Sequence, residues 1–431
     1  MRTYGGTSNH WGGWDWSYEF FDLNPRPIRP QHWPTQVIAD LPYYWNRNPG
    51  TSSYDSAQKI CQLGPFKFDD PEYWVKEFST PERPLEQMPL GGTGMKTRVL
   101  QYNSIKFEYL YGPAVENSSN IDIYRNANFI RFETTSVGGK QHVNKAVVKP
   151  IVCRSGNPVP CKEVNFEADY FVLAAGGIES TRLLLLSGLG NSSGHLGKTF
   201  MDHPYSWNLR SIPVLGNDKI PQGVKNFYFS QNPIPLNNGK GTTFGAALVP
   251  TEDFINDPSN PIGDFRILLG GLGNWFTPGT VSTNTEFLPH PNSYISLSDQ
   301  TDFFGQRKVK LDWAETPTDR QTVRTAATAA KNTLEGLGYG TVTNLPPLQQ
   351  NPWDWPSPWS ISMGLHPMGS TRMSAQEKDG VVNTNMRVWD TANLYVASSS
   401  TFPTSGGYVN PTYSICALAI RLADFLMTKP N

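Results

Sequence analysis

The chain of 431 residues is long enough for a large buried core and for two interleaved domains. Its 36 Lys and Arg residues balance its 37 Asp and Glu residues, which argues against electrostatic attraction to nucleic acid or to an anionic membrane. Only 17% of the residues are charged, whereas 38 are glycine and 36 are proline. This composition favours a loop-rich enzyme over a helical scaffold.

No apolar stretch of the sequence is long enough to span a membrane. The best candidate, residues 171–186, is interrupted by Glu179 and Arg182. No signal peptide is apparent, because Met1-Arg2-Thr3 leads directly into glycine-rich sequence. A soluble protein is expected, and the sequence leaves open whether it is cytoplasmic, periplasmic or secreted.

The cysteines and most of the histidines lack the spacing of metal ligands, so no metal site is predicted. Cys153 and Cys161 could pair across a hairpin, and reduced thiols are an equal alternative. The other residues considered are Cys61, Cys416, His32, His142, His195 and His290.

The predicted elements begin with a loop at the glycine-rich residues 5–13, followed by a Pro- and Trp-rich stretch with little periodicity. Residues 122–152 alternate as strands do, around a probable turn at Gly138-Gly139. Residues 168–175 have the pattern of a buried strand, Gly176-Gly177 predict a tight turn, and residues 178–186 predict a helix. A strand–glycine–helix unit is typical of half a nucleotide-binding layer.

The second half of the chain predicts short strands over residues 206–300 and a helix over residues 317–335 that stops at Gly336. A last helix should begin at Pro411, because Asn410 is a favourable N-cap and proline suits the first helical position. Its N-terminus would carry about half a positive charge, which suits an anion. An ordinary capped core helix explains this segment equally well.

The most specific motif precedes this helix. It reads Leu-His-Pro-Met-Gly-Ser-Thr-Arg-Met over residues 365–373, and Val409-Asn410-Pro411-Thr412 follows after a strand at residues 393–397. A neutral imidazole suits the removal of a hydroxyl proton, so His366 is a candidate general base. The alternative is a hydrogen-bonded loop histidine.

Five separated segments resemble the glucose-methanol-choline (GMC) flavoprotein oxidoreductases, in the family's order. The sugar and polyol branch, with pyranose oxidases and fructose or gluconate dehydrogenases, is the most similar. The segments are residues 5–13, 171–180, 196–203, 366–373 and 393–412.

The resemblance implies an α/β fold with two interleaved domains. An FAD-binding α/β domain would comprise residues 1–35, 95–205 and 361–431. A substrate-binding domain, built on an antiparallel sheet with flanking helices, would comprise residues 36–94 and 206–360 together with connecting loops.

The resemblance also implies an FAD-dependent oxidoreductase that acts on a CH–OH group of a sugar, glycoside or other alcohol. His366 would take the hydroxyl proton, Asn410 would hold the substrate oxygen, and hydride would pass to flavin N5. Asn410 could instead only cap the helix, and His203 is given a structural role. The residues expected near the flavin are Gly6, Ser8, Asn9, His10, Trp11, Ala175, Gly176, Ser400, Val409, Pro411 and Thr412.

Two features of the first motif bear on cofactor and substrate. Ser8-Asn9-His10-Trp11 resembles the pyranose oxidase segment whose histidine is attached covalently to the flavin, so His10 is a candidate for covalent FAD attachment; a loop histidine near the flavin is the alternative. Tryptophans beside the motifs predict either stacking faces for a sugar or filling of a loop-rich core. They are Trp11, Trp14, Trp16, Trp353, Trp355 and Trp359.

The sequence departs from the family in one large respect. Family members open with a strand and a Gly-x-Gly-x-x-Gly turn that holds the FAD pyrophosphate. Neither Gly92-Thr93-Gly94 nor Gly271-Leu272-Gly273 has the required context. The chain begins about where the family's second flavin segment begins, so an N-terminal FAD-binding segment is expected to be missing. A smaller departure is Ser398, where the family usually has glycine.

This gap leaves alternatives open. The chain could be an inactive remnant, or one chain of a split flavoenzyme whose partner is a separate N-terminal FAD-binding polypeptide. An electron-accepting subunit is another candidate partner, and oxygen, a quinone or haem are equally compatible acceptors. A hydrolase reading of residues 190–194, which match Gly-x-Ser-x-Gly, fails because a helix rather than a strand is predicted before the serine.

Overall fold

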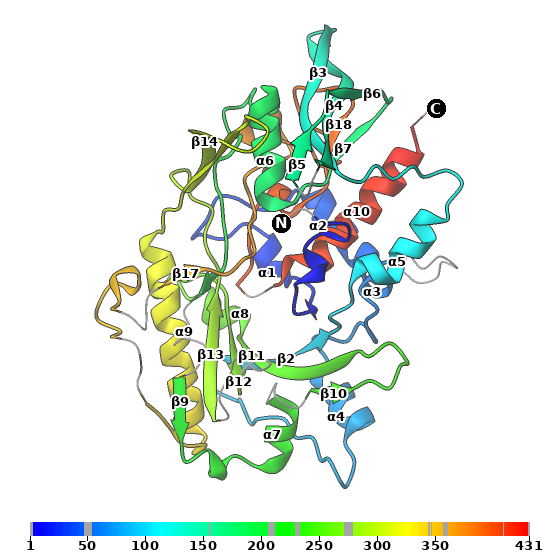
Figure 1. Cartoon of the computed structure of the whole chain (residues 1–431). Helices are drawn as coiled ribbons and strands as arrows, with labels where there is room; N and C mark the ends of the chain where they lie inside the picture. The colour runs from blue at the N-terminus through cyan, green and yellow to red at the C-terminus, as the bar shows by residue number, and fades with distance from the viewer. Residues whose placement is uncertain are drawn as a thin grey trace.

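The computed structural model shows an α/β protein whose sheets and helices form two regions that share residues from distant parts of the chain (Figure 1). The structure describes residues 3–46, 54–154, 157–205, 212–228, 233–270, 279–343, 345, 347–356, 361–407 and 409–429. The predicted α/β class with an antiparallel sheet is confirmed.

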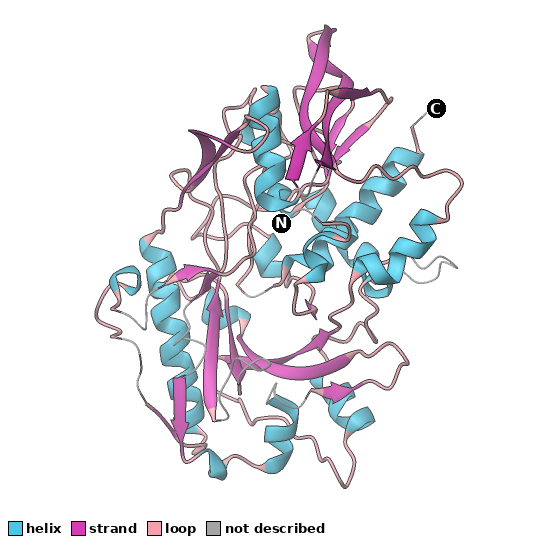
Figure 2. Ribbon diagram, viewed as in Figure 1, coloured by secondary structure: helices cyan, strands magenta, loops and turns pink. Residues whose placement is uncertain are grey.

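The largest sheet lies in the lower half of Figure 2, and the long helix α9 runs along it. Its strand order is β1-β2-β11-β12-β13-β9-β16, with β10 paired to β11, and its described pairings are antiparallel. The central strands β11, β12 and β13 are buried apart from Thr243, with α9 against β12 and β13 and α7 against β11. The elements are β1 (Trp14–Asp15), β2 (Met95–Tyr102), β9 (Ile212–Leu215), β10 (Ile234–Pro235), β11 (Thr243–Pro250), β12 (Phe265–Leu269), β13 (Thr280–Thr285), β16 (Thr341–Val342) and α9 (Pro317–Gly336).

The second region contains a short parallel pair, β7 with β18, and the helices α6 and α10. An antiparallel sheet of β3, β4, β5 and β6 stands beside it (Figure 1). The elements are β3 (Ala127–Val137), β4 (Lys140–Arg154), β5 (Asn157–Pro160), β6 (Val164–Phe166), β7 (Phe171–Leu173), α6 (Gly176–Ser187), β18 (Leu394–Val396) and α10 (Pro411–Met427).

Shorter elements connect these regions. Two further antiparallel pairs are β14 with β15 and β8 with β17. The helices are η1 (Gly6–Asn9), α1 (Phe20–Leu23), α2 (Thr35–Trp45), α3 (Ala57–Ile60), α4 (Pro71–Phe78), α5 (Phe107–Glu116), η3 (Asn217–Lys219), α7 (Gln222–Tyr228), α8 (Glu252–Ile255), η5 (Pro352–Asp354), η6 (Glu377–Asp379) and η7 (Ser399–Thr401). The strands are β8 (Pro204–Tyr205), β14 (Tyr294–Thr301), β15 (Arg307–Asp312) and β17 (Ser362–Met363).

Most of the predicted elements are confirmed. The hairpin turns at Gly138-Gly139, α9 begins at Pro317, and α10 begins at Pro411. Gly176 has a φ of 84°, so the chain turns there as predicted, but α6 begins at Gly176 rather than at Ile178.

The helices between residues 20 and 78 were not predicted. In α2 the buried residues Val37, Leu41 and Trp45 do follow helical spacing, but Pro42 lies inside the helix and obscured the pattern. The packing of α2 against α10 supplies the burial that stabilises it.

Two apolar cores hold the molecule together. One gathers the residues around β7, β18, α6 and α10, and the other lies between the large sheet and α9. Both cores draw on segments far apart in sequence, as an interleaved arrangement requires. The domain boundaries predicted from the resemblance remain a prediction.

Within the described residues, no helix is both long and apolar enough to cross a membrane. Cys61, Cys161 and Cys416 are free thiols, and the side chain of Cys153, the other member of the considered pair, lies outside the described residues. The described residues contain no cluster of His, Cys, Asp or Glu that could hold a metal ion.

Candidate active site

Four polar side chains from four segments meet at the N-terminus of α10. His366 lies in the loop after β17, His203 lies just before β8, Arg266 comes from β12 and Asn410 precedes Pro411. His366 Nδ1 is 2.8 Å from His203 Nδ1, and its Nε2 is 3.2 Å from Asn410 Nδ2. Arg266 donates to Asn410 Oδ1 over 3.4 Å. The predicted pair of His366 and Asn410 is therefore in direct contact.

The carboxylate of Asp202 holds the His366 loop in place. Its oxygens accept the backbone N–H groups of His203 (2.7 Å), Leu365 (3.2 Å) and His366 (2.8 Å). Burial raises the pKa of Asp202 to about 6, and the hydrogen bonds from these N–H groups oppose that rise. Asp202 therefore ties the two histidine segments together through their main chains.

His203 is buried and makes hydrogen bonds on both ring nitrogens. Its Nε2 is 2.8 Å from the carbonyl oxygen of Gly406 and 3.3 Å from that of Ser405. Burial and, to a lesser extent, the charge of Arg266 lower the pKa of His203 to about 4. The imidazole is therefore neutral near pH 7. The sequence assigned His203 only a structural role. In the structure, its ring contacts His366 directly.

Asn410 occupies the N-cap position of α10, but its side chain makes no capping hydrogen bond. The amide instead joins His366 and Arg266. The alternative in which Asn410 serves only as a cap is therefore wrong. Neither Asp202 nor Arg266 was identified from the sequence, although an arginine inside the apolar run Phe265–Leu269 was a signal that could have been noticed.

A second helix N-terminus lies close to the His366 loop. A Cβ on Gly177 would lie 2.1 Å from the carbonyl oxygen of Pro367, so α6 touches the residue after His366. The N-cap residue of α6, Ala175, has no capping side chain, and Ala175 and Gly176 are both exposed. The first-turn N–H groups of α6 and α10 thus lack side-chain caps, which fits the binding of an anionic group such as a flavin nucleotide.

Replacing Gly177 by alanine should disturb this contact. The new methyl group overlaps the Pro367 carbonyl, which is backbone and cannot rotate away. We expect a loss of about 1–3 kcal/mol in the free energy of unfolding, measured by denaturant titration. Gly336→Ala in α9 is the matched control, because its Cβ meets nothing within 4 Å. Equal stability of the two variants would contradict the contact.

The first predicted segment packs on α5. Asn9 Nδ2 donates to Glu108, Trp11 Nε1 donates to the Ile105 carbonyl, and Ser8 accepts the Phe107 N–H. Gly6 and His10 are exposed. Trp14 and Trp16, slightly later in the chain, connect this segment to the His366 cluster. Both rings lie beside the Arg266 guanidinium.

The remaining predicted cofactor residues flank α10. Ser400 is buried and hydrogen-bonded to Thr371 and Ser398, so Ser398 fits without a clash in this turn. The side chain of Val409 is also buried, whereas Thr412 is half-buried in the first turn of the helix.

The aromatic residues divide between core and surface. Trp16 and Trp355 are buried, which supports core filling for these two. Trp11 and Trp353 are half-buried, and Trp353 packs near Phe287 and Trp313. Trp359 lies outside the described residues, as do Gly271-Leu272-Gly273.

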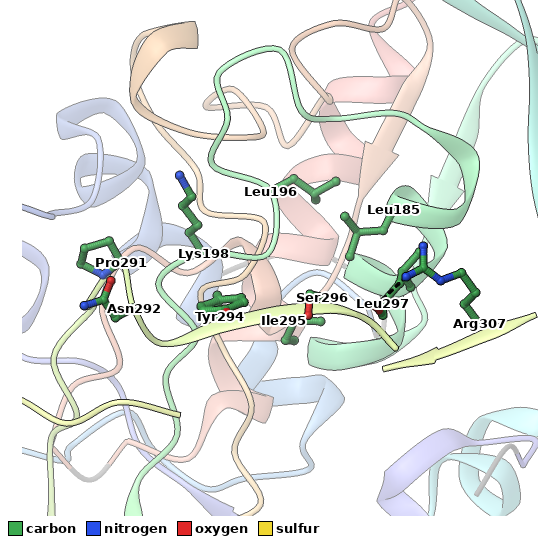
Figure 3. Close-up of a pocket in the computed structure, with 10 residues that line it drawn as sticks. All are labelled: Leu185, Leu196, Lys198, Pro291, Asn292, Tyr294, Ile295, Ser296, Leu297 and Arg307. Atoms are coloured by element: carbon green, nitrogen blue, oxygen red, sulfur yellow. Dashed lines mark hydrogen bonds between the residues drawn. The ribbon is translucent and has the colours of Figure 1, made fainter. Parts of the chain in front are cut away.

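A hollow of about 590 Å³ lies elsewhere, between β14, the end of α6 and residues 196–198 (Figure 3). Lys198, Tyr294 and Arg307 line it, and Arg307 donates to the Leu297 carbonyl over 2.8 Å. None of the residues of the His366 cluster lines this hollow.

The serine of the Gly-x-Ser-x-Gly match is not a nucleophile. Ser192 follows α6 rather than a strand, and its hydroxyl donates to Glu377. A nucleophile elbow requires a strand before the serine. The hydrolase reading is therefore excluded at this position.

Acid should destabilise the protein through His203. The unfolded chain takes up a proton on this imidazole near pH 6.5 and the folded chain only near pH 4, so stability due to His203 is lost as the pH falls through this range. Between these pH values, the free energy of unfolding should fall by about 3 kcal/mol relative to that of His203→Asn. Denaturant titrations at both pH values measure this difference.

Asp202 acts in the opposite direction, because its pKa is raised from 3.8 to about 6 and protonation therefore favours the folded state. Both proteins in the comparison retain Asp202, so its contribution cancels. A surface variant, His32→Asn, should follow the wild type. If the free energy of unfolding depended on pH in the same way in wild type and in His203→Asn, the lowered pKa of His203 would be contradicted.

Comparison with known proteins identifies the family. Two family models, both described as GMC oxidoreductase, match residues 79–205 and 289–419, which together are more than half of the chain. The chain belongs to the GMC oxidoreductase family.

Two of the similar curated proteins are dehydrogenases. A 2-methyl-1,2-propanediol dehydrogenase of Mycolicibacterium austroafricanum is 28% identical over 62% of this chain and 49% of that protein. The fructose dehydrogenase large subunit of Gluconobacter japonicus is 27% identical over 60% of this chain and 47% of that protein. The chain thus spans about half the length of these relatives.

The fold has a solved counterpart. The crystal structure of pyridoxine 4-oxidase from Mesorbium loti aligns with a TM-score of 0.50 and 16% identity, over 78% of this chain and 65% of the other. At this identity the likeness supports the fold alone.

Proposed function

We propose that this protein takes part in the FAD-dependent oxidation of a CH–OH group in a sugar, glycoside or other alcohol, at His366 and Asn410. The observation that carries the proposal is the contact between Asn410 Nδ2 and His366 Nε2 at the uncapped N-terminus of α10. Such a pair offers a base for a hydroxyl proton beside a donor for the same oxygen.

Each residue has a distinct task in this proposal. His366 Nε2 removes the hydroxyl proton, and the Asn410 amide N–H donates to the substrate oxygen. Arg266 keeps the Asn410 amide oriented by donating to its oxygen. The N–H groups at the starts of α6 and α10 would hold the anionic parts of the cofactor. FAD, when bound, supplies the acceptor for the hydride that leaves the substrate carbon, at flavin N5.

The substrate class is supported by the relatives, whose names specify a diol and fructose. The half-buried Trp11 and Trp353 are the proposed stacking faces for such a substrate. The exposed His10 is the proposed point of covalent FAD attachment. The similarity to a protein described as a large subunit supports a further subunit as a partner, and an electron-accepting subunit is the proposed one.

A visible absorbance spectrum of the purified protein, before and after acid precipitation, tests cofactor binding. An oxidised-flavin band supports the proposal, and yellow colour that remains with the pellet supports covalent attachment at His10. The His10→Ala variant should then release its flavin into the supernatant. A colourless protein that also rejects added FAD would contradict flavin binding by this chain alone.

A second candidate is one chain of a split flavoenzyme. The observation in its favour is the parallel sheet of β7 and β18, which among the described residues consists of these two strands alone. Parallel sheets are usually larger and covered on both faces. Co-purification of a polypeptide with a Gly-x-Gly-x-x-Gly turn, together with flavin, would support this arrangement over an inactive remnant.

A further inference from the structure

A chain of hydrogen bonds with fixed polarity at both ends runs through the proposed site. It connects Arg266, Asn410, His366, His203 and the carbonyl of Gly406 in that order. The successive distances are 3.4 Å, 3.2 Å, 2.8 Å and 2.8 Å. Because each ring nitrogen can either donate or accept, the two ends of the chain decide the direction of every bond between them.

The Gly406 end fixes the tautomer of His203. A carbonyl oxygen only accepts, so His203 Nε2 must carry a hydrogen. The ring is buried and neutral near pH 7, which leaves a lone pair on its Nδ1. The hydrogen between the two histidines must therefore come from His366 Nδ1. In the neutral form of His366, Nε2 then carries no hydrogen.

The Arg266 end gives the same answer independently. A guanidinium only donates, so the Asn410 atom that faces it is the amide oxygen. The Asn410 nitrogen, which only donates, then faces His366 Nε2. This nitrogen must hold a lone pair. Both ends of the chain thus specify one tautomer of His366, with its hydrogen on Nδ1.

We propose that His203 and Arg266 are positioning residues that hold His366 in the tautomer whose Nε2 lone pair, which accepts from Asn410 in this structure, can take the substrate proton. The mechanistic meaning of this inference rests on the proposed function, but the tautomer can be measured without substrate. When His366 Nε2 gains the hydroxyl proton, its Nδ1–H stays donated to His203.

His203 does not itself take up the proton. It is buried, and the positive charge of Arg266 acts on it. The other charged groups that face it are Glu286, which acts through space in the opposite sense, and Asp202, which accepts its main-chain N–H. His203 therefore orients His366, and the gained charge remains on the His366 ring.

Nitrogen NMR of protein labelled with ¹⁵N-histidine tests the inference, since the chain has only seven histidines. The His366 signals are assigned with His366→Gln. Wild type should show His366 protonated on Nδ1 and His203 on Nε2 at neutral pH. His203→Asn should preserve the His366 tautomer, because the Asn oxygen can accept from Nδ1. His203→Leu alone should keep this tautomer through the Arg266–Asn410 contact, whereas His203→Leu combined with Arg266→Leu should give a mixture of tautomers.

Flavin reduction provides the second readout. In flavin-loaded protein, His203→Leu should lower the reduction rate about 10- to 100-fold, and His203→Asn should restore most of it. The inference is overturned if wild-type His366 carries its hydrogen on Nε2, or if the double variant His203→Leu/Arg266→Leu leaves the tautomer unchanged. If His203→Leu does not fold, the spectra of wild type and His203→Asn still show which nitrogen of His366 carries the hydrogen. If the expected tautomers are observed but no alcohol reduces the flavin, the proposed function is refuted and the inference about the tautomer stands.

Discussion

Replacing His366 by alanine should abolish reduction of bound flavin by substrate while leaving the flavin in place. The variant removes the Nε2 lone pair beside Asn410, and loss of a general base lowers a rate about 10²- to 10⁴-fold. Stopped-flow loss of the visible flavin absorbance measures this rate. Binding should be unaffected, because the helix N-termini of α6 and α10 remain.

His32→Ala is the matched control. His32 is an exposed loop histidine whose Nδ1 lies 3.1 Å from the Pro30 carbonyl, so its loss should leave the rate unchanged. Unchanged reduction kinetics in His366→Ala would remove His366 from the mechanism. Loss of flavin from His366→Ala, with no change in the rate of the retained fraction, would assign this residue to cofactor binding instead.

Replacing Glu286 by alanine should cause the largest loss of stability. This fully buried carboxylate bonds to Arg29 over 3.1 Å and to Arg26 over 3.4 Å, and it also accepts the Asp264 N–H. Its removal leaves two buried guanidinium groups without their counter-charge. Breaking such a pair costs about 3–5 kcal/mol, measurable as a fall in the free energy of unfolding.

The isosteric Glu286→Gln variant separates charge from hydrogen bonding, and it should lie between wild type and alanine. Asp299→Ala is the control, because it breaks the exposed pair with Arg307 and should not change stability measurably. If Glu286→Ala were as stable as Asp299→Ala, the buried arginines would have to be satisfied by main-chain carbonyls alone. Arg26 already donates to the carbonyls of Ile255 and Ile262.

Local patterns in the sequence determined both ends of α9, the start of α10 and the hairpin of β3 and β4. Pro317, Pro411 and the Gly138-Gly139 turn act within a few residues, so their effect is visible without the fold. The motifs around His366 and Asn410 also placed the chain in its family. The roles of these two residues remain predictions.

Only the tertiary structure decided which side chains surround His366. His203 is 163 residues away in sequence and Asn410 is 44 residues away, yet both contact its ring. Sequence periodicity carries no information about such distant contacts. The same limit explains the unused cap at Asn410, since only the fold brings His366 and Arg266 to its amide. The direction of the hydrogen bonds at His366 is therefore a property of the fold.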